Sequence, residues 1–206
     1  MNASIVFTVA SERTAAGDTV AMNGRVCPES VAPWLDNPVR RWVTGSRRLA
    51  RRYLSPGMTV LDVGCGPAPM LVDIVRAIGP GGRLICVDIQ RGMLERVARK
   101  VVRLGVCDRV RLHLSHPDDL GLEPGLVDVA IAFWMVHEAP DPHRLLGQIR
   151  DTLKPAGRFL MIEPAMHVSK QVFNDGIAWN QSHGMMMEHG AHGWMNRMAC
   201  FTKCDV

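Results

Sequence analysis

Two segments of the chain contain residues whose types and spacing suit the binding of a nucleoside. One apolar run ends in a glycine turn, Val60-Leu61-Asp62-Val63-Gly64-Cys65-Gly66-Pro67. A second apolar run, Leu84 to Ile89, contains the acid Asp88, 22 positions after Gly66 (88 − 66). Glycines let the main chain turn sharply and approach a ligand closely, and an acid at the end of the next strand can accept both hydroxyls of a ribose. The pattern predicts a site for a ribose-bearing cofactor.

The glycine turn also indicates the type of cofactor. A dinucleotide fingerprint needs a third glycine, G-x-G-x-x-G, so that a helix N-terminus can close on a pyrophosphate. Here the run continues Gly66-Pro67-Ala68-Pro69 without one. Asp62, two residues before the turn, adds a negative charge that opposes a pyrophosphate but suits a ligand with an ammonium group. These residues favour S-adenosylmethionine, which has an amino-acid tail and no phosphate, over NAD.

The motifs resemble those of the class I, Rossmann-like S-adenosylmethionine-dependent methyltransferases. The resemblance runs clearly from about Leu54 to Glu163, and it is weaker toward the C-terminus. The matching segments are Leu61 to Pro67, Val87-Asp88 followed by Met93-Leu94, Asp128 to Ala132, and Leu145-Leu146 through Leu153 to Leu160. The resemblance implies that the cofactor is bound by Asp62, Gly64, Cys65, Gly66, Asp88, Ile89, Met93, His116 and Phe133.

Two of these positions have a second interpretation. His116 stands where related sequences usually have an acid near the adenine amino group, so Asp118, Asp119 or a backbone carbonyl is the alternative contact. Cys65 could be taken as a nucleophile, but methyl transfer needs none. We therefore interpret Cys65 as a residue that packs in the tight turn.

The loop after the expected fourth strand, Phe133 to Pro142, provides candidates for catalysis. In the family this loop lies beside the methyl-bearing sulfur. His137 and Glu138 are candidate general bases, and His137 is preferred because its ordinary pKa is close to neutral. Glu163 is a third candidate, and the alternative is that these residues only cap or orient the loop. The implied reaction is in-line displacement, with aromatic rings such as Phe133, Trp134 or Trp34 stabilising the sulfonium charge.

Apolar runs alternate with amphipathic helical patterns, which predicts a doubly wound α/β fold. Five runs read as buried parallel strands covered by helices on both faces. A helix and an antiparallel hairpin then complete a mainly parallel, seven-stranded sheet, with ligands at the carboxyl ends of the strands. The expected strands cover residues 58–63, 83–88, 110–114, 127–133, 158–162, about 185–188 and about 195–203. The expected helices lie near 37–54, 70–78, 93–104, 145–153 and 169–181.

The chain is expected to have two parts, a lid and a cofactor-binding domain. Residues 1–55 would form a flexible segment and a lid helix, and residues 56–206 the methyltransferase domain. Residues 1 to about 25 show no lasting periodicity and are expected to be a flexible lead-in or a lid. The expected lid helix has a basic face that could bind RNA or anionic lipid. No aromatic residues alternate with its arginines, so we interpret it as a solvated surface.

Composition limits the location and the partners. The chain has 206 residues, 47% of them apolar, a net charge of +4 and a pI of about 8.9, which does not indicate a nucleic-acid partner. Its six cysteines show no close pairing pattern, which favours reduced thiols in the cytoplasm. The apolar run from 5 to 10 is too short for a signal peptide or a membrane span. We expect a cytoplasmic protein with a small-molecule acceptor, and a homodimer is left open.

The C-terminal tail is rich in histidine, methionine and cysteine, which raises the question of a metal. Its spacings, His189-x-x-His192 and Cys200-x-x-x-Cys204, are not those of zinc fingers. We therefore predict no metal site. Two functions from other classes remain as alternatives: a non-catalytic S-adenosylmethionine-binding or partner-binding module, and an NAD-dependent oxidoreductase.

Overall fold

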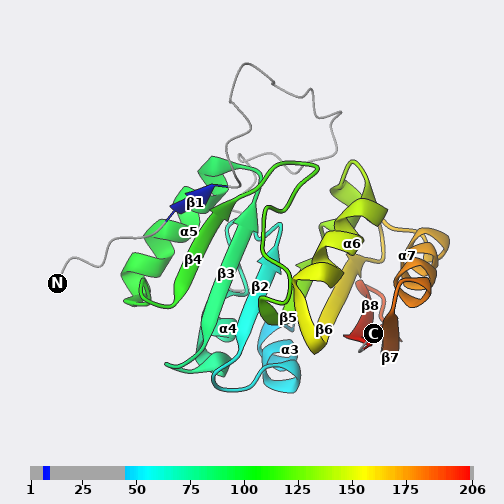
Figure 1. Cartoon of the computed structure of the whole chain (residues 1–206), viewed down its shortest axis with the longest axis horizontal. Helices are drawn as coiled ribbons and strands as arrows, with labels where there is room; N and C mark the ends of the chain where they lie inside the picture. The colour runs from blue at the N-terminus through cyan, green and yellow to red at the C-terminus, as the bar shows by residue number, and fades with distance from the viewer. Residues whose placement is uncertain (1–6, 10–44, 205–206) are drawn as a thin grey trace, which may run out of the picture.

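A mixed sheet of eight strands runs through the part of the chain that the computed structural model describes, residues 7–9 and 45–204 (Figure 1). The strand order is β1-β4-β3-β2-β5-β6-β8-β7. The pairings from β1 to β6 are parallel, and β8 is antiparallel to β6 and β7. The strands are β1 (Phe7–Val9), β2 (Thr59–Val63), β3 (Arg83–Asp88), β4 (Val110–Leu114), β5 (Val127–Phe133), β6 (Leu153–Pro164), β7 (Met185–His192) and β8 (Asn196–Lys203). The predicted mainly parallel sheet with its C-terminal hairpin is confirmed in β2 to β8.

Strand β1 was not predicted, and it lies within the segment that was expected to be a flexible lead-in or a lid. Phe7 to Val9 pair in parallel with β4 at the edge of the sheet. The Thr8 hydroxyl lies 3.0 Å from Nδ1 of His113, and it accepts a hydrogen bond from Nε of Arg111 at 2.9 Å. A strand of three residues is too short to show an alternating pattern, so no periodicity marks it in the sequence. The remaining residues of 1–44, including Trp34 and the first part of the expected lid helix, lie outside the described residues.

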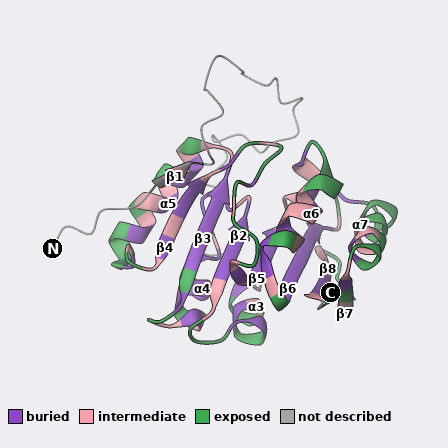
Figure 2. Ribbon diagram, in the orientation of Figure 1, coloured by how far each residue is buried: buried purple, intermediate pink, exposed green. Residues whose placement is uncertain are grey.

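Helices cover both faces of the sheet, as predicted. One apolar cluster joins α3 (Ser46–Tyr53), α4 (Leu71–Ile78) and α5 (Arg91–Leu104) to one face, and a second joins α6 (Pro142–Thr152) and α7 (Lys170–Ser182) to the other. Neighbouring strand residues alternate between the clusters: Val60 belongs to the first and Leu61 to the second, and both are fully buried. The central strands are therefore buried along most of their length (Figure 2).

Local signals explain where several helices begin and end. The Asp141 side chain accepts a hydrogen bond from the Arg144 amide at 3.0 Å, and Pro142 occupies the first turn of α6. Ser169 caps α7 in the same way through the Val172 amide at 3.2 Å. Helix α5 ends at Gly105, whose φ of 65° is left-handed. The caps of α6 and α7 follow the carboxyl ends of β5 and β6, whereas Gly105 precedes the start of β4.

The direction of the chain reverses at the centre of the sheet. From β2 it proceeds to β3 and β4 on one side, and it later returns to β5 and β6 on the other side. The connections that leave β2 and β5 at their carboxyl ends therefore diverge, which opens a crevice between them. The fold thus places a ligand site after Val63, Asp88 and Phe133.

The first strand of the C-terminal hairpin is longer than predicted. Strand β7 was expected to stop near Glu188 before a glycine-rich connection, but it continues to His192. Its register with β8 shifts between Met187 and His189. No helix in the described part of the chain combines the length and the apolar character needed to cross a bilayer.

The turn between α4 and β3 offers a matched pair of glycines that tests this packing. A methyl group on Gly82 would lie 2.5 Å from Cβ of Ile78 and 2.7 Å from its carbonyl oxygen, whereas one on Gly81 meets no atom within 4 Å. Gly82→Ala should therefore lower the free energy of unfolding by roughly 1 to 3 kcal/mol, and Gly81→Ala should change it by less than about 0.5 kcal/mol. Urea unfolding of both variants measures the difference, and equal values would contradict the packing.

Candidate functional site

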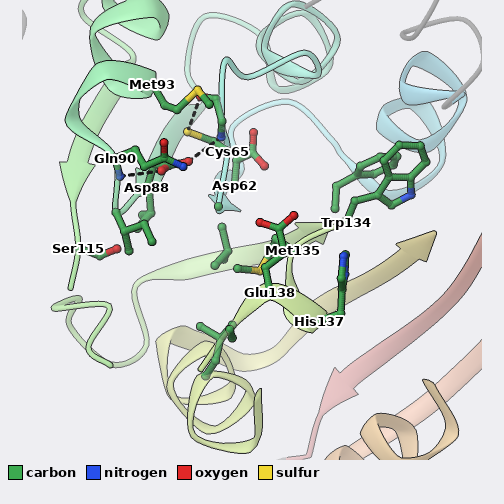
Figure 3. A pocket seen from close by; sticks show the side chains of 18 of the residues that line it. Asp62, Cys65, Asp88, Gln90, Met93, Ser115, Trp134, Met135, His137 and Glu138 are labelled. Atoms are coloured by element: carbon green, nitrogen blue, oxygen red, sulfur yellow. Dashed lines mark hydrogen bonds between the residues drawn. The ribbon is translucent and has the colours of Figure 1, made fainter. Parts of the chain in front are cut away.

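A cavity of about 310 Å³ opens at the carboxyl edge of β2, β3 and β5. Its lining contains all nine residues predicted to bind the cofactor and the two preferred candidates for catalysis, His137 and Glu138, but not the third candidate, Glu163. Figure 3 shows several of these side chains pointing toward the same space from different elements. The predicted residues in the lining are Asp62, Gly64, Cys65, Gly66, Asp88, Ile89, Met93, His116, Phe133, His137 and Glu138.

The glycine loop after β2 brings bare main chain to this cavity. Gly64 and Gly66 have φ angles of 60° and 52°, in the left-handed region that favours glycine. A methyl group on Gly64 would lie 3.0 Å from the Met135 side chain, whereas one on Gly66 would meet no protein atom within 4 Å. Nζ of Lys100, on α5, holds the loop by donating to the carbonyl oxygens of Pro67 at 2.7 Å and Ala68 at 3.1 Å. The space beside Gly66 is therefore open to a ligand.

Asp88 ties the end of β3 to the glycine loop. Its Oδ2 accepts from the Gly66 amide at 2.8 Å, and its Oδ1 accepts from the Gln90 amide at 2.8 Å. Each carboxylate oxygen can accept a further hydrogen bond. Burial raises the pKa of Asp88 to about 6, although these backbone hydrogen bonds act in the opposite direction. The carboxylate is thus fixed in place at the border of the cavity.

Asp62 is a second buried carboxyl group at this edge, and it is 3% exposed. Burial raises its pKa to about 7, the nearby charge of Asp88 adds to the rise, and Lys100 reduces it. A cation bound here would reverse this penalty because it favours the ionised carboxylate. The electrostatics therefore suit a positively charged group of a ligand.

Cys65 lies in the glycine loop but is not suited to act as a nucleophile. A hydrogen bond with Cys86 raises its pKa well above the usual range, and burial adds to the effect. Because the reactive form of cysteine is the thiolate, the Cys65 thiol is inert at neutral pH. This agrees with its interpretation as a packing residue.

His137 forms a dyad with Glu163 at the opposite side of the cavity. Nδ1 of His137, on the 3₁₀ turn η2 (Val136–Glu138), is hydrogen-bonded to Oε2 of Glu163. Oε1 of Glu163 accepts from the Val136 amide at 2.9 Å, and the glutamate is 3% exposed. The hydrogen bond to Glu163 raises the pKa of His137, and burial opposes the rise. With Nδ1 occupied, Nε2 is the ring nitrogen left to accept a proton.

The sequence named Glu163 only as a separate candidate for the base. Its pairing with His137 was missed because 26 residues separate them. They meet because β5 and β6 are adjacent parallel strands whose carboxyl ends coincide. This adjacency was the one signal that could have suggested the pair.

The loop after β4 places His116, but not the neighbouring acids, in the lining of the cavity. Asp118 lies 3.7 Å from Nη1 of Arg144, and Oδ1 of Asp119 accepts from the Gly121 amide at 2.8 Å. Both acids border a smaller adjacent hollow instead. Ser115 and Gln90 line the cavity itself, and sequence reasoning did not name them.

Trp134 has a backbone conformation that the sequence could not reveal. Its φ is 59°, which is rare for a large side chain. The Trp134 amide donates to the Ile162 carbonyl at 2.7 Å, and Nε1 donates to Oδ1 of Asn196 at 2.8 Å. Its ring lies 5.3 Å from that of Phe133, centroid to centroid. The two rings therefore form an aromatic wall at the end of β5.

Comparison with known proteins gives a family. A family described as a methyltransferase domain matches residues 54–198. The demethylmenaquinone methyltransferase of Symbiobacterium thermophilum is 31% identical over 132 residues, 64% of this chain and 53% of that protein. An uncharacterised 37.1 kDa protein from a Streptomyces fradiae transposon is 35% identical over 109 residues, 53% of this chain and 31% of that protein. The chain thus spans about half or less of the length of these two relatives.

The fold agrees with that of solved structures. A S-adenosylmethionine-dependent methyltransferase from Aquifex aeolicus superposes with a TM-score of 0.78 at 21% identity. The alignment covers 86% of this chain and 100% of the Aquifex chain. At this identity the likeness establishes the shared fold.

The raised pKa of Asp62 predicts a dependence of stability on pH. Its folded pKa of about 7 exceeds the ordinary value of 3.8, so the stability it contributes is present below pH ~4 and is lost as pH rises through ~7. Asp62→Asn removes this loss of stability because asparagine does not ionise. Relative to the wild type, the variant should gain roughly 1 to 3 kcal/mol between pH 5 and pH 8.

Urea unfolding of the unliganded protein at the two pH values measures this gain. A stability difference between Asp62→Asn and the wild type that stays constant from pH 5 to pH 8 would contradict the raised pKa.

Proposed function

The chain belongs to the class I S-adenosylmethionine-dependent methyltransferase family, and we propose that this domain methylates a small-molecule acceptor. The proposal rests on the cavity, which brings together Asp88, an acid placed to accept from ribose hydroxyls, Asp62, a buried acid that favours a bound cation, and His137, a candidate base. The cofactor supplies a sulfonium whose methyl group is already activated for displacement. The protein then has to bind and orient the cofactor and the acceptor, exclude water, and accept a proton from the acceptor.

The residues of the cavity fit S-adenosylmethionine, the cofactor of this family. Asp88 is fixed by two amides at the end of β3, where an acid can accept from ribose hydroxyls. Buried Asp62 suits the ammonium group of the amino-acid tail, and the open space beside Gly66 admits the ligand against main chain. Met93, Ile89 and Leu120 supply an apolar lining for the adenine ring of the cofactor. A pyrophosphate would instead meet two carboxylates, which argues against the NAD alternative.

The opposite wall supports an acceptor that has an ionisable proton. His137 borders the cavity with its Nδ1 held by Glu163, so Nε2 can receive a proton when the acceptor attacks. Phe133, Trp134 and Met135 make this wall apolar and aromatic. These features suit a hydroxylated aromatic or other apolar acceptor. The name of the Symbiobacterium relative, a demethylmenaquinone methyltransferase, points in the same direction.

The proposal includes a role for His137 or Glu138 as the general base and for residues 1–55 as a lid. We assign the base to His137 because Glu163 both orients the ring and raises its pKa. Glu138 also lines the cavity and is the alternative base. The lid expected in residues 1–55 would shape the acceptor pocket. The alternative of a non-catalytic module predicts cofactor binding without methyl transfer. Incubation with radiolabelled S-adenosylmethionine and a library of hydroxylated aromatics tests it, because labelled product forms only if the domain transfers the methyl group.

The first test concerns the cofactor. Asp88→Ala removes the acceptor for the ribose hydroxyls and the tie to the glycine loop, worth roughly 2 to 4 kcal/mol together. The affinity for S-adenosylhomocysteine, measured by calorimetry, should fall ~30-fold or more. Asp175→Ala, which removes an exposed carboxylate on α7, is the control and should leave the affinity unchanged. Full affinity in a folded Asp88→Ala variant would sink the assignment.

The second test concerns the base. Because a base acts when deprotonated, the rate should rise with pH through an apparent pKa above 6.5, the ordinary value for histidine. His137→Gln should remove this limb and lower the rate ~100-fold or more, with unchanged cofactor affinity. Glu163→Gln should move the limb to lower pH, because it removes the group that raises the pKa.

A comparison variant and a comparison acceptor complete this experiment. If Glu138 were the base, Glu138→Gln would remove the limb and His137→Gln would keep it. If the limb instead followed the acidity of the acceptor and survived in both variants, alignment alone would account for the catalysis.

A further inference from the structure

The irregular register in β7 gathers three potential metal ligands at the edge of the sheet. Met187 pairs with Phe201 and His189 pairs with Cys200, so Glu188 is an extra residue that has no partner of its own in β8. Such a bulge re-aims side chains that would otherwise alternate between the two faces. One ligand atom each of Glu188, His189 and Cys200 lies within 4.8 Å of the other two. None of the three lines the cofactor cavity.

We propose that Glu188, His189 and Cys200 bind a divalent cation of the zinc class. A carboxylate oxygen, an imidazole nitrogen and a thiolate sulfur are the three donor types that zinc takes from proteins. Its bonds to them are about 2.0 to 2.3 Å long, so in tetrahedral geometry two ligands of one ion lie ~3.3 to 3.8 Å apart. The three ligand atoms, all within 4.8 Å of one another, would have to approach by up to about 1 Å to surround a single ion.

Contacts outside the three ligands hold the carboxylate in position. Oε1 of Glu188 accepts from Nε of Arg158 on β6 at 3.1 Å and from the Thr202 hydroxyl on β8. Its other oxygen, Oε2, lies 3.6 Å from Sγ of Cys200. Outer contacts of this kind orient metal ligands and strengthen binding. Glu188 thus presents one oxygen to the cluster while the other is held by its neighbours.

Tyr53, the last residue of α3, holds the histidine. Its ring stacks on the imidazole of His189, with centroids 5.6 Å apart and planes 12° from parallel. The Tyr53 hydroxyl contacts Nε2 of His189. The phenol oxygen is therefore a fourth donor beside the cluster, next to the carboxylate oxygen, the imidazole nitrogen and the thiol sulfur. An ion here would join β7 and β8 to the end of α3.

The Cys200 thiol is the third donor; it is fully buried, and its Sγ lies 3.6 Å from Oε2 of Glu188. Binding would break the S–H bond, form a metal–sulfur bond and release the proton to solvent. Glu188 is exposed and His189 is half-buried, so the ion has a route from solvent.

This proposal departs from the sequence prediction of no metal site. That prediction rested on the spacings His189-x-x-His192 and Cys200-x-x-x-Cys204. The proposed ligands instead come from two paired strands, and Glu188 and His189 are neighbours in sequence. Adjacent residues of a regular strand point to opposite faces, and the bulge is what makes the combination available.

The test uses the full chain, stripped with a chelator and titrated with Zn²⁺ against a chromophoric chelator. We expect one ion per chain, and Co²⁺ in its place should give the near-ultraviolet absorption of a thiolate–cobalt bond. Cys200→Ala and His189→Asn should each lower the Zn²⁺ affinity ~30-fold or more, and Tyr53→Phe ~10-fold. Cys204→Ala and His192→Asn, which alter an exposed cysteine and an exposed histidine nearby, are the controls and should change it less than ~2-fold.

Two further measurements keep the test decisive. Zn²⁺ should raise the melting temperature of the wild type but not of Glu188→Gln, a change at an exposed position of the edge strand that the fold should tolerate. A pH-indicator dye should also report about one proton released per ion bound by the wild type. Equal affinity in Cys200→Ala and Cys204→Ala, or no binding at ~10 µM Zn²⁺, would overturn the proposal.

Discussion

Two carboxyl groups buried at the ends of adjacent central strands set the conditions for the rest of the site. Asp62 and Asp88 are 3% and 6% exposed, and burial raises the pKa of both. A buried acid is tolerated when hydrogen bonds or a counter-charge compensate for lost hydration. Two amides partly supply this for Asp88, and a cationic ligand would supply it for Asp62. The glycine loop, the Lys100 contacts and the open cavity all serve to keep this arrangement accessible.

Much of the fold could be predicted because the central strands are buried on both faces. Such strands appear in the sequence as continuous apolar runs, and β3, β4 and β5 end where these runs end. The cofactor side of the cavity was equally readable, because glycines and an acid at the ends of successive strands have a direct geometric meaning. The lining residues therefore came together as the motifs implied.

Other features depended on pairings between segments that are distant in the sequence. The dyad of His137 and Glu163 exists because β5 and β6 are neighbours, and β1 is positioned by its pairing with β4. The β7 bulge is visible only in the register against β8. In each case no local pattern of residue types carries the information, since what matters is which strand lies beside which.

The backbone of Trp134 limits which residues can replace it at the edge of the cavity. A residue with φ of 59° is held in a conformation that glycine and asparagine adopt readily and that other side chains adopt at a cost of about 1 to 3 kcal/mol. Replacing Trp134 with another large residue would keep this strain, whereas glycine would relieve it and remove the aromatic ring from the wall of the cavity. A substitution at this position therefore trades conformational stability against the shape of the cavity, whereas Phe133 and Met135 can change without this constraint because neither has a positive φ.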